Sequence, residues 1–416
     1  MNIDFLKKIG HMVLDRPMDW YLDKRSMSRI KKHLDSLEER KKTLPIKVAY
    51  VVQMPEVWDK QQPVYEAMAK DERFDVSFII VPKYDFQNNK IGEYGRERKF
   101  FHKKYPDAKF LLAINKSGEL INIAKYKFDY IFYERPYDIY LPDTLKASKV
   151  CRISKVCYVP YVTHDSADKG RIFNRDFYRH VYMGFTNSEI FCRNLKKSFS
   201  EKNLKYHKFV NLGYPILDIC RTLEDIPHDK KCIMWAPRWA FTKEIGGSHF
   251  LDYKDEMLDF ALDNKSVDIV ERPHPLMFPN IIKTGIMSEN EVQNYKKKCE
   301  ENCIKFDNNM MIEDSFKKTD ILISDWSSIL WLFFYTGKPI IYCPCDVELS
   351  EELDEIVKLM YIAESWEDVK RILDDLLNGN DYMKEQREHY LELQKNKYND
   401  ATGSILEFVY DDFTSQ

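Results

Sequence analysis

Short apolar runs, rich in β-branched and aromatic residues, alternate with helix-like stretches through most of this sequence. Runs of about four to eight such residues between helices are typical of strands buried in a parallel sheet. The runs that share this pattern are 46–53, 74–81, 128–133, 155–162, 207–212, 231–235, 267–271, 320–324 and 339–342. The sequence therefore predicts an α/β protein in which these runs form strands.

The alternation falls into two successive blocks, with a join near residues 195–210, and 416 residues exceed the length of one ordinary domain. We predict a helical segment over 1–45, a Rossmann-like domain over 46–200, and a second Rossmann-like domain with C-terminal helices over 201–416. Two such domains that face each other across a ligand cleft form a GT-B-like architecture, which is the expected fold class.

The composition describes a folded protein without a strong global charge: 44% of the residues are hydrophobic and 31% are charged. A formal net charge of −3 gives no general attraction to nucleic acid, so no nucleic-acid partner is expected. The nine cysteines are scattered and form no CxxC pair. This pattern indicates a reducing compartment, with neither a disulfide framework nor a zinc site.

Charged residues interrupt the start of the chain, so it does not read as a signal peptide. The longest apolar run, residues 329–335, is far shorter than the ~20 residues that a membrane span needs. We therefore expect a cytoplasmic protein with no segment that crosses a membrane.

Residues 1–45 form an amphipathic pattern in which Phe5, Ile9, Met12 and Val13 fall on one helix face. The segment holds eleven Lys and Arg against seven Asp and Glu, a net charge of +4. A basic amphipathic helix can lie on an anionic membrane surface, here the inner face of the cell membrane. A helix packed across the first domain explains the pattern equally well.

The segment 320–342, DILISDWSSILWLFFYTGKPIIY, reads as strand, tight turn, helix and strand. Ser327 and Ser328 fall at the start of the helix, where a cap and a first-turn residue belong. Hydroxyls at such a helix start can bind phosphate, or can merely cap the helix, which we expect of at least one of them. Asp325 would repel phosphate, so we expect it to position the turn or to hold an arginine.

Two further strand ends carry cationic groups: Arg238 follows 231–235, and Arg272 and His274 follow 267–271. In open α/β sheets, ligands bind at the carboxyl ends of the strands. The prolines that flank His274 fix its position just beyond its strand. The sequence therefore predicts one phosphate-binding rim shared by Arg238, Arg272, His274, Ser327 and Ser328.

In the first domain, His164 follows the run 155–162 and can accept a proton from an attacking hydroxyl, with Asp165 or Asp168 orienting it. Metal ligation is the rival interpretation. The sequence shows no HxH or HExxH spacing and no cluster of three carboxylates, so no metal is expected.

The sequence combines the His164 loop with GYP at 213–215, APR at 236–238, RPHP at 272–275 and SDWSS at 324–328, followed by KPIIY at 338–342. In these motifs, over roughly residues 150–345, it resembles the CDP-glycerol glycerophosphotransferase family, the teichoic-acid primases and polymerases and their capsule-building relatives. The resemblance implies a GT-B-like fold, a peripheral position on the inner face of a bacterial membrane, and no separate cofactor. It implies transfer of a polyol phosphate from a CDP-activated donor to a glycan or lipid-linked hydroxyl, with release of CMP.

By this resemblance, His164 is the catalytic base, His274 is the RPHP histidine, Ser327 and Ser328 are the phosphate-binding pair, and Lys169 is the lysine that follows the first histidine. The sequence departs from the family where His-Gly-Thr is replaced by His164-Asp165-Ser166 and where Arg238 replaces a threonine. Asp165, Ser166 and Lys169 are therefore candidates for the acceptor side, and the departure allows a donor or acceptor other than the usual one.

The expected mechanism is direct displacement at phosphorus, with His164 and His274 as the catalytic residues. Arg238, Arg272, Asp325, Ser327 and Ser328 are the expected donor-binding residues. A GT-B nucleotide-sugar glycosyltransferase of surface polysaccharide synthesis is the first alternative, and a scaffold that retains the fold without chemistry is the second.

Overall fold

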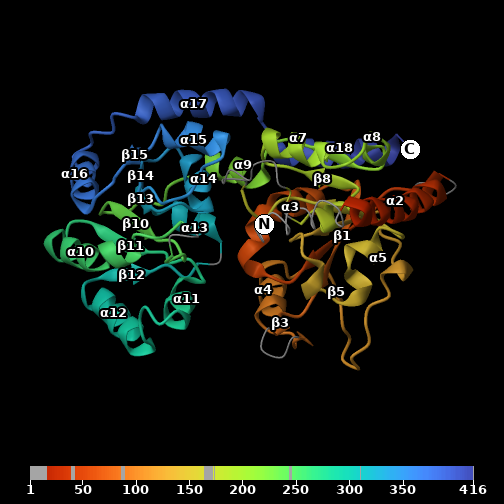
Figure 1. The fold of residues 1–416 in the computed structure, drawn as a ribbon, viewed down its shortest axis with the longest axis horizontal. Coiled ribbons are helices and arrows are strands. Elements are labelled where there is room, and N and C mark those ends of the chain that lie inside the picture. Colours follow the sequence, from red (N-terminus) through yellow and green to blue (C-terminus); the bar gives the residue numbers. More distant parts are fainter. Residues whose placement is uncertain are drawn as a thin grey trace, which may run out of the picture. The chain divides into compact units, whose positions relative to one another are not determined.

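The computed structural model describes residues 16–38, 43–85, 90–163, 172, 174–242, 246–309 and 311–415 (Figure 1). The chain divides into two compact units. The first comprises Met1–Tyr161, Gly170–Pro215 and Asp400–Gln416, and the second comprises Val162–Lys169 and Ile216–Asn399. Each unit is built on a parallel sheet with helices between its strands, which confirms the predicted α/β class.

The first unit contains a seven-stranded sheet in the order β5-β2-β1-β6-β7-β8-β9, and every neighbouring pair runs parallel. Its strands are β1 (Ile46–Val52), β2 (Phe74–Ile80), β5 (Lys109–Leu112), β6 (Tyr130–Tyr133), β7 (Lys155–Tyr158), β8 (Met183–Phe185) and β9 (Lys208–Val210). A small antiparallel pair, β3 (Tyr84–Asp85) and β4 (Lys90–Ile91), accompanies it.

The helices of the first unit are α2 (Arg16–Glu38), α3 (Gln62–Lys70), α4 (Arg96–Lys104), α5 (Ala147–Val150), α6 (Arg175–Tyr178), α7 (Glu189–Lys197), α8 (Glu201–Leu204) and α18 (Ala401–Thr414). The 3-10 helices in the described part of this unit are η2 (Pro55–Lys60), η3 (Ile123–Lys125), η4 (Asp138–Tyr140) and η5 (Asp143–Leu145).

Helix α2 packs on the first unit through a stripe of one face, in which Asp23, Ser26, Ile30 and His33 are buried. The contacts that fix it are largely polar, because Asp23 accepts hydrogen bonds from Arg175 at 3.1 and 2.6 Å. The Ser26 hydroxyl donates to a backbone carbonyl 2.6 Å away. The apolar residues predicted for the start of the chain, Phe5 to Val13, lie outside the described residues. The part of the helix that is described therefore does pack across the first unit.

The second unit contains a six-stranded parallel sheet in the order β12-β11-β10-β13-β14-β15. Its strands are β10 (Cys232–Ala236), β11 (Asp268–Glu271), β12 (Ile304–Phe306), β13 (Ile321–Ser324), β14 (Ile340–Tyr342) and β15 (Tyr361–Ile362). Its helices are α9 (Pro215–Arg221), α10 (Phe250–Asp263), α11 (Met277–Lys283), α12 (Glu289–Glu301), α13 (Ile312–Phe316), α14 (Ser328–Phe334), α15 (Glu351–Val357), α16 (Trp366–Leu377) and α17 (Lys384–Lys397).

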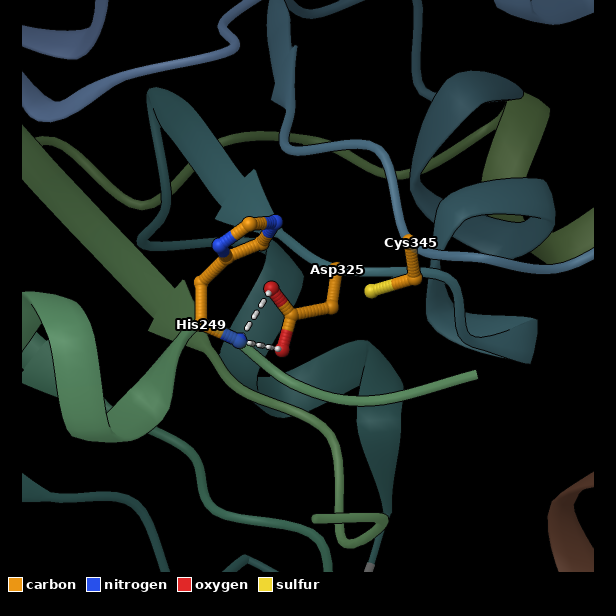
Figure 2. Close-up of side chains that lie close together, drawn as sticks. All are labelled: His249, Asp325 and Cys345. Carbon is orange, nitrogen blue, oxygen red and sulfur yellow. Dashed lines mark hydrogen bonds between the residues drawn. The ribbon is translucent and has the colours of Figure 1, made fainter. Parts of the chain in front are cut away.

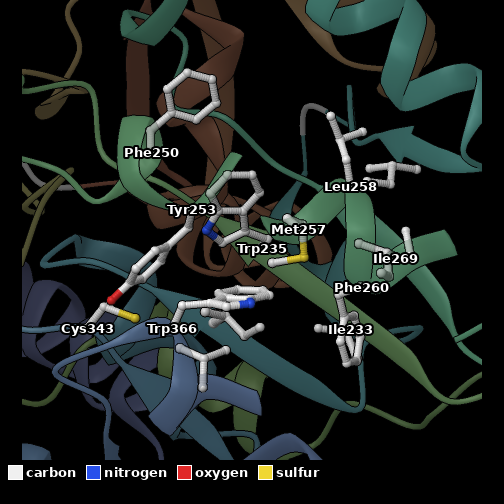
Figure 3. Close-up of a cluster of buried hydrophobic side chains, with 14 of the residues drawn as sticks. Ile233, Trp235, Phe250, Tyr253, Met257, Leu258, Phe260, Ile269, Cys343 and Trp366 are labelled. Atoms are coloured by element: carbon white, nitrogen blue, oxygen red, sulfur yellow. The ribbon is translucent and has the colours of Figure 1, made fainter. Parts of the chain in front are cut away.

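The core of the second unit lies between this sheet and helices that include α10 and α16 (Figure 3). Trp235 of β10 is buried and stacks on Phe250 of α10, with ring centroids 5.7 Å apart. Trp366 of α16 closes the same cluster against Tyr253. Burial of large aromatic side chains stabilises this layer by roughly 2–3 kcal/mol each. The carboxyl ends of β10, β11 and β13 are therefore held in fixed positions.

Two segments that lie within the range predicted for the second domain belong to the first unit. Strand β9 lies within the range predicted for the second domain, but it pairs with β8 at the edge of the first sheet. Helix α18, at the end of the chain, belongs to the first unit and packs on α3. The buried Asp412 of α18 binds Lys155 of β7 and Lys208 of β9, each at 2.5 Å, which explains why this helix returns to the first sheet.

Among the helices that the structure describes, none has the length and apolar character that crossing a bilayer requires. All nine cysteines are free thiols, as the scattered spacing predicts.

Candidate active site

Three neighbouring strands of the second sheet, β11, β10 and β13, end at the same edge, since all three run parallel. The loops that follow them carry Arg272 and His274, Arg238, and Asp325 with Ser327 and Ser328. The structure therefore brings these predicted residues to one edge of one sheet, as the strand-end argument expects.

Asp325 accepts hydrogen bonds from two loops at this edge of the sheet. Its side chain is buried, and one carboxylate oxygen accepts hydrogen bonds from the Arg238 backbone N–H at 3.0 Å and the Ser248 hydroxyl at 2.7 Å. The backbone N–H of His249 donates to the same carboxylate. Burial raises the pKa of Asp325, and these donors oppose that rise. Asp325 thus positions two loops, and it binds the backbone of Arg238 and not the guanidinium.

Asp325 also lies close to His249 and Cys345, a group whose possible ligand atoms are within 4.8 Å of one another (Figure 2). Figure 2 shows that the hydrogen bonds to Asp325 come from the backbone nitrogen of His249 and not from its ring. The ring Nε2 donates instead to the Pro344 carbonyl at 2.8 Å, and burial raises the pKa of Cys345 to about 11. The Asp325 carboxylate is already occupied by donors from Arg238, Ser248 and His249, so the structure gives it a positioning role in this group.

The Arg238 guanidinium is buried beside two indole rings. Its central carbon lies 4.2 Å from the ring centroid of Trp326 and 5.8 Å from that of Trp239. Gly246 allows this placement, since a Cβ atom there would lie 2.5 Å from the guanidinium, and its φ of +94° also favours glycine. The two rings and this glycine hold a positive charge at the edge of the sheet.

His274 is a neutral hydrogen-bond donor at this edge. Its Nδ1 accepts from the Leu276 backbone N–H at 3.1 Å, so the ring proton is on Nε2. Burial, and then the nearby charge of Arg238, lower its pKa to about 4. Within the described part of the chain, Nε2 has no hydrogen-bond partner, so its N–H can donate to a ligand.

Arg272 makes contacts of a different kind. Its guanidinium pairs with Asp307, which follows β12, and it donates to the Ser315 hydroxyl at 3.1 Å and the Asn309 carbonyl at 3.2 Å. These bonds hold the loop after β12 against the loop after β11. The structure therefore gives Arg272 a positioning role, and phosphate binding by its guanidinium stays a prediction.

Ser327 and Ser328 differ from the other helix-starting serines of the chain. Ser327 occupies the N-cap position of α14, but its side chain makes no capping hydrogen bond. At five other helices the N-cap serine does accept a backbone N–H, namely Ser188, Ser200, Ser288, Ser350 and Ser365. Ser327 and Ser328 are half-buried, and neither hydroxyl has a partner among the described residues. The expected cap is therefore absent, and both hydroxyls are available to a ligand.

His164, Asp165, Ser166 and Lys169 lie outside the described residues, which resume at 172 after Thr163. Their assigned roles stay predictions. Sequence reasoning did not single out Trp239 and Trp326, which flank Arg238, although Trp239 directly follows the APR motif and Trp326 lies inside the SDWSS motif.

The fold is shared with solved structures of low sequence identity. A UDP-N-acetylglucosamine 2-epimerase is 13% identical with a TM-score of 0.57, over 90% of this chain and 98% of that one. The UDP-GlcNAc 2-epimerase of Neisseria meningitidis bound to UDP-GlcNAc is 12% identical, with a TM-score of 0.55 over 88% of this chain and 100% of that one. The wall teichoic acid polymerase TagF is 15% identical, with a TM-score of 0.51 over 99% of this chain and 97% of that one. These similarities confirm the predicted GT-B-like fold class.

A comparison with curated protein sequences gives no match. The profile of the CDP-Glycerol:Poly(glycerophosphate) glycerophosphotransferase family matches residues 162–407, which include the loops that carry Arg238, His274, Ser327 and Ser328. A match over more than half of the sequence, on the unit that holds this edge, decides the family. The chain belongs to the CDP-glycerol:poly(glycerophosphate) glycerophosphotransferase family.

Proposed function

We propose that this enzyme transfers glycerol phosphate, or a related polyol phosphate, from a CDP-activated donor to a hydroxyl of a glycan or lipid-linked acceptor. The family to which the chain belongs supports the donor and the class of reaction. One structural observation supports the site: the hydroxyls of Ser327 and Ser328 have no protein partner in the described chain, at the edge where Arg238 and His274 also lie.

In this reaction the acceptor oxygen forms a bond to the phosphorus that carries the polyol. The bond between that phosphorus and the bridging oxygen breaks, and CMP leaves with the electron pair. Ser327, Ser328 and the Nε2–H of His274 donate hydrogen bonds to the phosphate oxygens, and Arg238 supplies the positive charge. Catalysis then consists of positioning and charge stabilisation.

His164 accepts the proton of the attacking hydroxyl, with Asp165 or Asp168 orienting the imidazole. Ser166 and Lys169 contact the acceptor. Replacement of His164 by alanine is expected to lower kcat by roughly 10²–10⁴ with little change in donor binding, measured as CMP release and donor titration. Near-normal turnover of this variant would remove His164 from the base role.

The donor site is tested with the double variant Ser327→Ala/Ser328→Ala. Because neither hydroxyl has a hydrogen-bond partner among the described residues, we expect an unchanged melting temperature and at least a tenfold weaker affinity for CDP-glycerol. The matched control is Ser365→Ala, which removes a cap that is made, with the Asp368 N–H at 3.2 Å. The control should cost about 1 kcal/mol of stability and leave donor affinity unchanged. Wild-type donor affinity in the double variant contradicts the proposed site.

The leaving group separates the alternatives. A glycosyltransferase would release a nucleoside diphosphate from a nucleotide sugar, whereas the proposed enzyme releases CMP from a CDP-polyol. A scaffold would bind CDP-glycerol without turnover. A panel of CDP-alcohols and nucleotide sugars, analysed for the released nucleotide, distinguishes all three.

A peripheral position on an anionic membrane forms part of this proposal, because a lipid-linked acceptor lies there. Helix α2 supports it by the character of its outer face. Met18, Trp20 and Tyr21 are 58%, 65% and 53% exposed, and the ammonium of Lys24 lies 5.0 Å from the Trp20 ring. Exposed aromatic residues among basic ones are typical of helices that lie at a membrane interface.

A further inference from the structure

We propose that Arg135, with Tyr137 and Tyr161, forms an anion-binding subsite in the first unit that recognises a phosphate group of the acceptor. The inference rests on the proposed function, since it assigns the acceptor of the same reaction to a chemical class. That class is an acceptor that carries a phosphate next to the hydroxyl that is extended, as the end of a polyol-phosphate chain does.

Arg135 sits at the carboxyl edge of the first sheet, two residues after β6 ends. Its neighbour Glu134 accepts the backbone N–H of Gln53 at 2.9 Å and that of Met54 at 3.0 Å, just beyond the adjacent strand β1. The Arg135 Nε lies 3.3 Å from the Glu134 carboxylate, and one Nη2 proton is donated to the Gln53 side-chain oxygen. The Gln53 amide is itself fixed by the Pro82 carbonyl at 2.7 Å. Glu134 and Gln53 therefore hold the Arg135 guanidinium in a fixed position.

Most of the hydrogen-bonding capacity of Arg135 is unused. A guanidinium carries five N–H donors. Among the described residues, Gln53 provides the single hydrogen-bond acceptor of Arg135. The Arg135 side chain is 10% exposed, and its Nε is buried without a hydrogen-bond partner. Nη1 has no hydrogen-bond partner among the described residues and is not buried, so its two N–H groups reach solvent and are available to a ligand.

The second unit contains a matching arginine, Arg272, whose guanidinium has several protein acceptors. The tripeptide Glu-Arg-Pro occurs at 134–136 after β6 and again at 271–273 after β11. Arg272 of the second copy pairs with Asp307 and donates to Ser315 and to a backbone carbonyl. The same local sequence thus has its protein acceptors in one unit and lacks them in the other.

Tyr140 contacts the Arg135 guanidinium, and Tyr137 contacts both Tyr140 and Tyr161. The hydroxyls of Tyr137 and Tyr161 are 2.6 Å apart, and their rings meet edge to face with centroids 5.9 Å apart. The Arg135 guanidinium lies 5.6 Å from the Tyr140 ring. Tyrosine hydroxyls donate to and accept from a polyol, and the fork of N–H groups of arginine matches phosphate oxygens. Tyr161 is also three residues before His164 in the sequence.

The one negative charge in direct contact with Arg135 is that of Glu134, within the part of the chain that is described. Glu134 is 4% exposed, and its carboxylate accepts hydrogen bonds from two backbone N–H groups. Glu134 offsets part of the positive charge of Arg135, so a bound phosphate is held either by the remaining charge or by the N–H groups alone. The variants below separate these two contributions.

The test uses the full-length enzyme, CDP-glycerol, and two soluble acceptors that differ in one group. One acceptor ends in glycerol phosphate, and the other ends in glycerol joined through a neutral ether. We expect Arg135→Gln to raise KM at least tenfold for the phosphate-bearing acceptor and less than threefold for the neutral one, with KM for CDP-glycerol unchanged. Arg135→Lys keeps the charge but loses the fork, so an intermediate KM is expected. Arg98→Gln, an exposed position on α4, serves as the control.

Equal changes in KM for the two acceptors would overturn the phosphate assignment. If Arg135→Gln does not fold, Tyr137→Phe, which removes one partner of the hydroxyl pair, must still raise KM for the phosphate-bearing acceptor. An unchanged KM in Tyr137→Phe would overturn the proposal in that case. Failure of the subsite differs from failure of the proposed function, because the wild-type enzyme then still releases CMP from CDP-glycerol.

Discussion

Glu271 is a carboxyl side chain with no exposed surface, at the last position of β11 and directly before the motif that holds His274. One of its oxygens accepts the Tyr295 hydroxyl at 2.7 Å, and the other is buried without a partner. Burial raises its pKa from 4.5 to about 8, so the side chain is mostly protonated at neutral pH.

This shift makes the stability of the second unit dependent on pH. The folded form holds its proton more tightly than the unfolded form, so its contribution is complete below pH 4.5 and is lost as the pH rises toward 8. The slope reaches at most about 1.4 kcal/mol per pH unit in that window. Glu271→Gln should remove this slope, measured by urea unfolding between pH 4.5 and 9. Glu301→Gln, with a side chain that is 61% exposed, should unfold as the wild type does. Identical slopes for wild type and Glu271→Gln would refute the assignment.

The sequence could place Arg238, His274, Ser327 and Ser328 at one edge of a sheet, because each follows a strand that the local sequence predicts. It could not show that Arg272 pairs with Asp307, since the two are far apart in the sequence and come together only when β11 pairs with β12. It also could not distinguish Arg135 from Arg272, because both stand in the same tripeptide. Their difference lies in what the neighbouring loop provides.

Helix α2 has two faces of different character. The stripe that contains Asp23, Ser26 and Ile30 is buried on the first unit. The exposed residues of the other face include the basic residues Lys24, Arg25, Lys31 and Lys32. A helix that is already fixed to the protein can bind a membrane without refolding, which lowers the entropy cost of binding.

We therefore expect Trp20→Ser/Tyr21→Ser to weaken binding to anionic vesicles by on the order of tenfold, in a cosedimentation assay at low salt. Both side chains are exposed, so stability should change by less than about 0.5 kcal/mol. Leu393→Ser, at a 54% exposed position on α17, is the control and should bind as the wild type does. Added salt should weaken binding by the wild type, because the lysine contacts are screened. Wild-type binding by the double variant would exclude this face from the membrane contact.

All nine predicted runs contain strands of the two sheets, because each is rich in large apolar residues and most are buried on both faces. The strands that were not predicted are short or lie at an edge: β3, β4, β5, β8, β12 and β15. Strand β12 (IKF) and strand β15 (YI) have too few residues to show a period. The sheet to which β9 belongs is decided by its pairing with β8, which local sequence does not encode.

At the scale of the whole molecule, the last helix completes the first unit. Asp412 of α18 is buried, and its carboxylate binds Lys155, Lys208 and the hydroxyls of Tyr130 and Tyr182. Lys155 is 3% exposed at its side chain, so the loss of Asp412 would leave a buried ammonium without its carboxylate.

Asp412→Ala should therefore destabilise the first unit by about 3–5 kcal/mol, measured by urea unfolding. Asp411→Ala is the matched control, since Asp411 is the neighbouring residue of the same helix and is exposed. It should change stability by less than about 0.5 kcal/mol. Equal stability of the two variants would show that the carboxylate network contributes little.

Because α18 belongs to the first unit, this unit can complete its folding only after residues 401–414 have been synthesised. Synthesis proceeds from residue 1, so β6, β7 and β9 leave the ribosome long before Asp412 does. The second unit, up to Asn399, can fold as soon as it emerges, whereas the unit made first waits for residues 401–414. Until then Lys155 lacks its counter-ion. We expect the interval between the emergence of β9 and of α18 to be the stage at which chaperones and proteases act on the nascent protein.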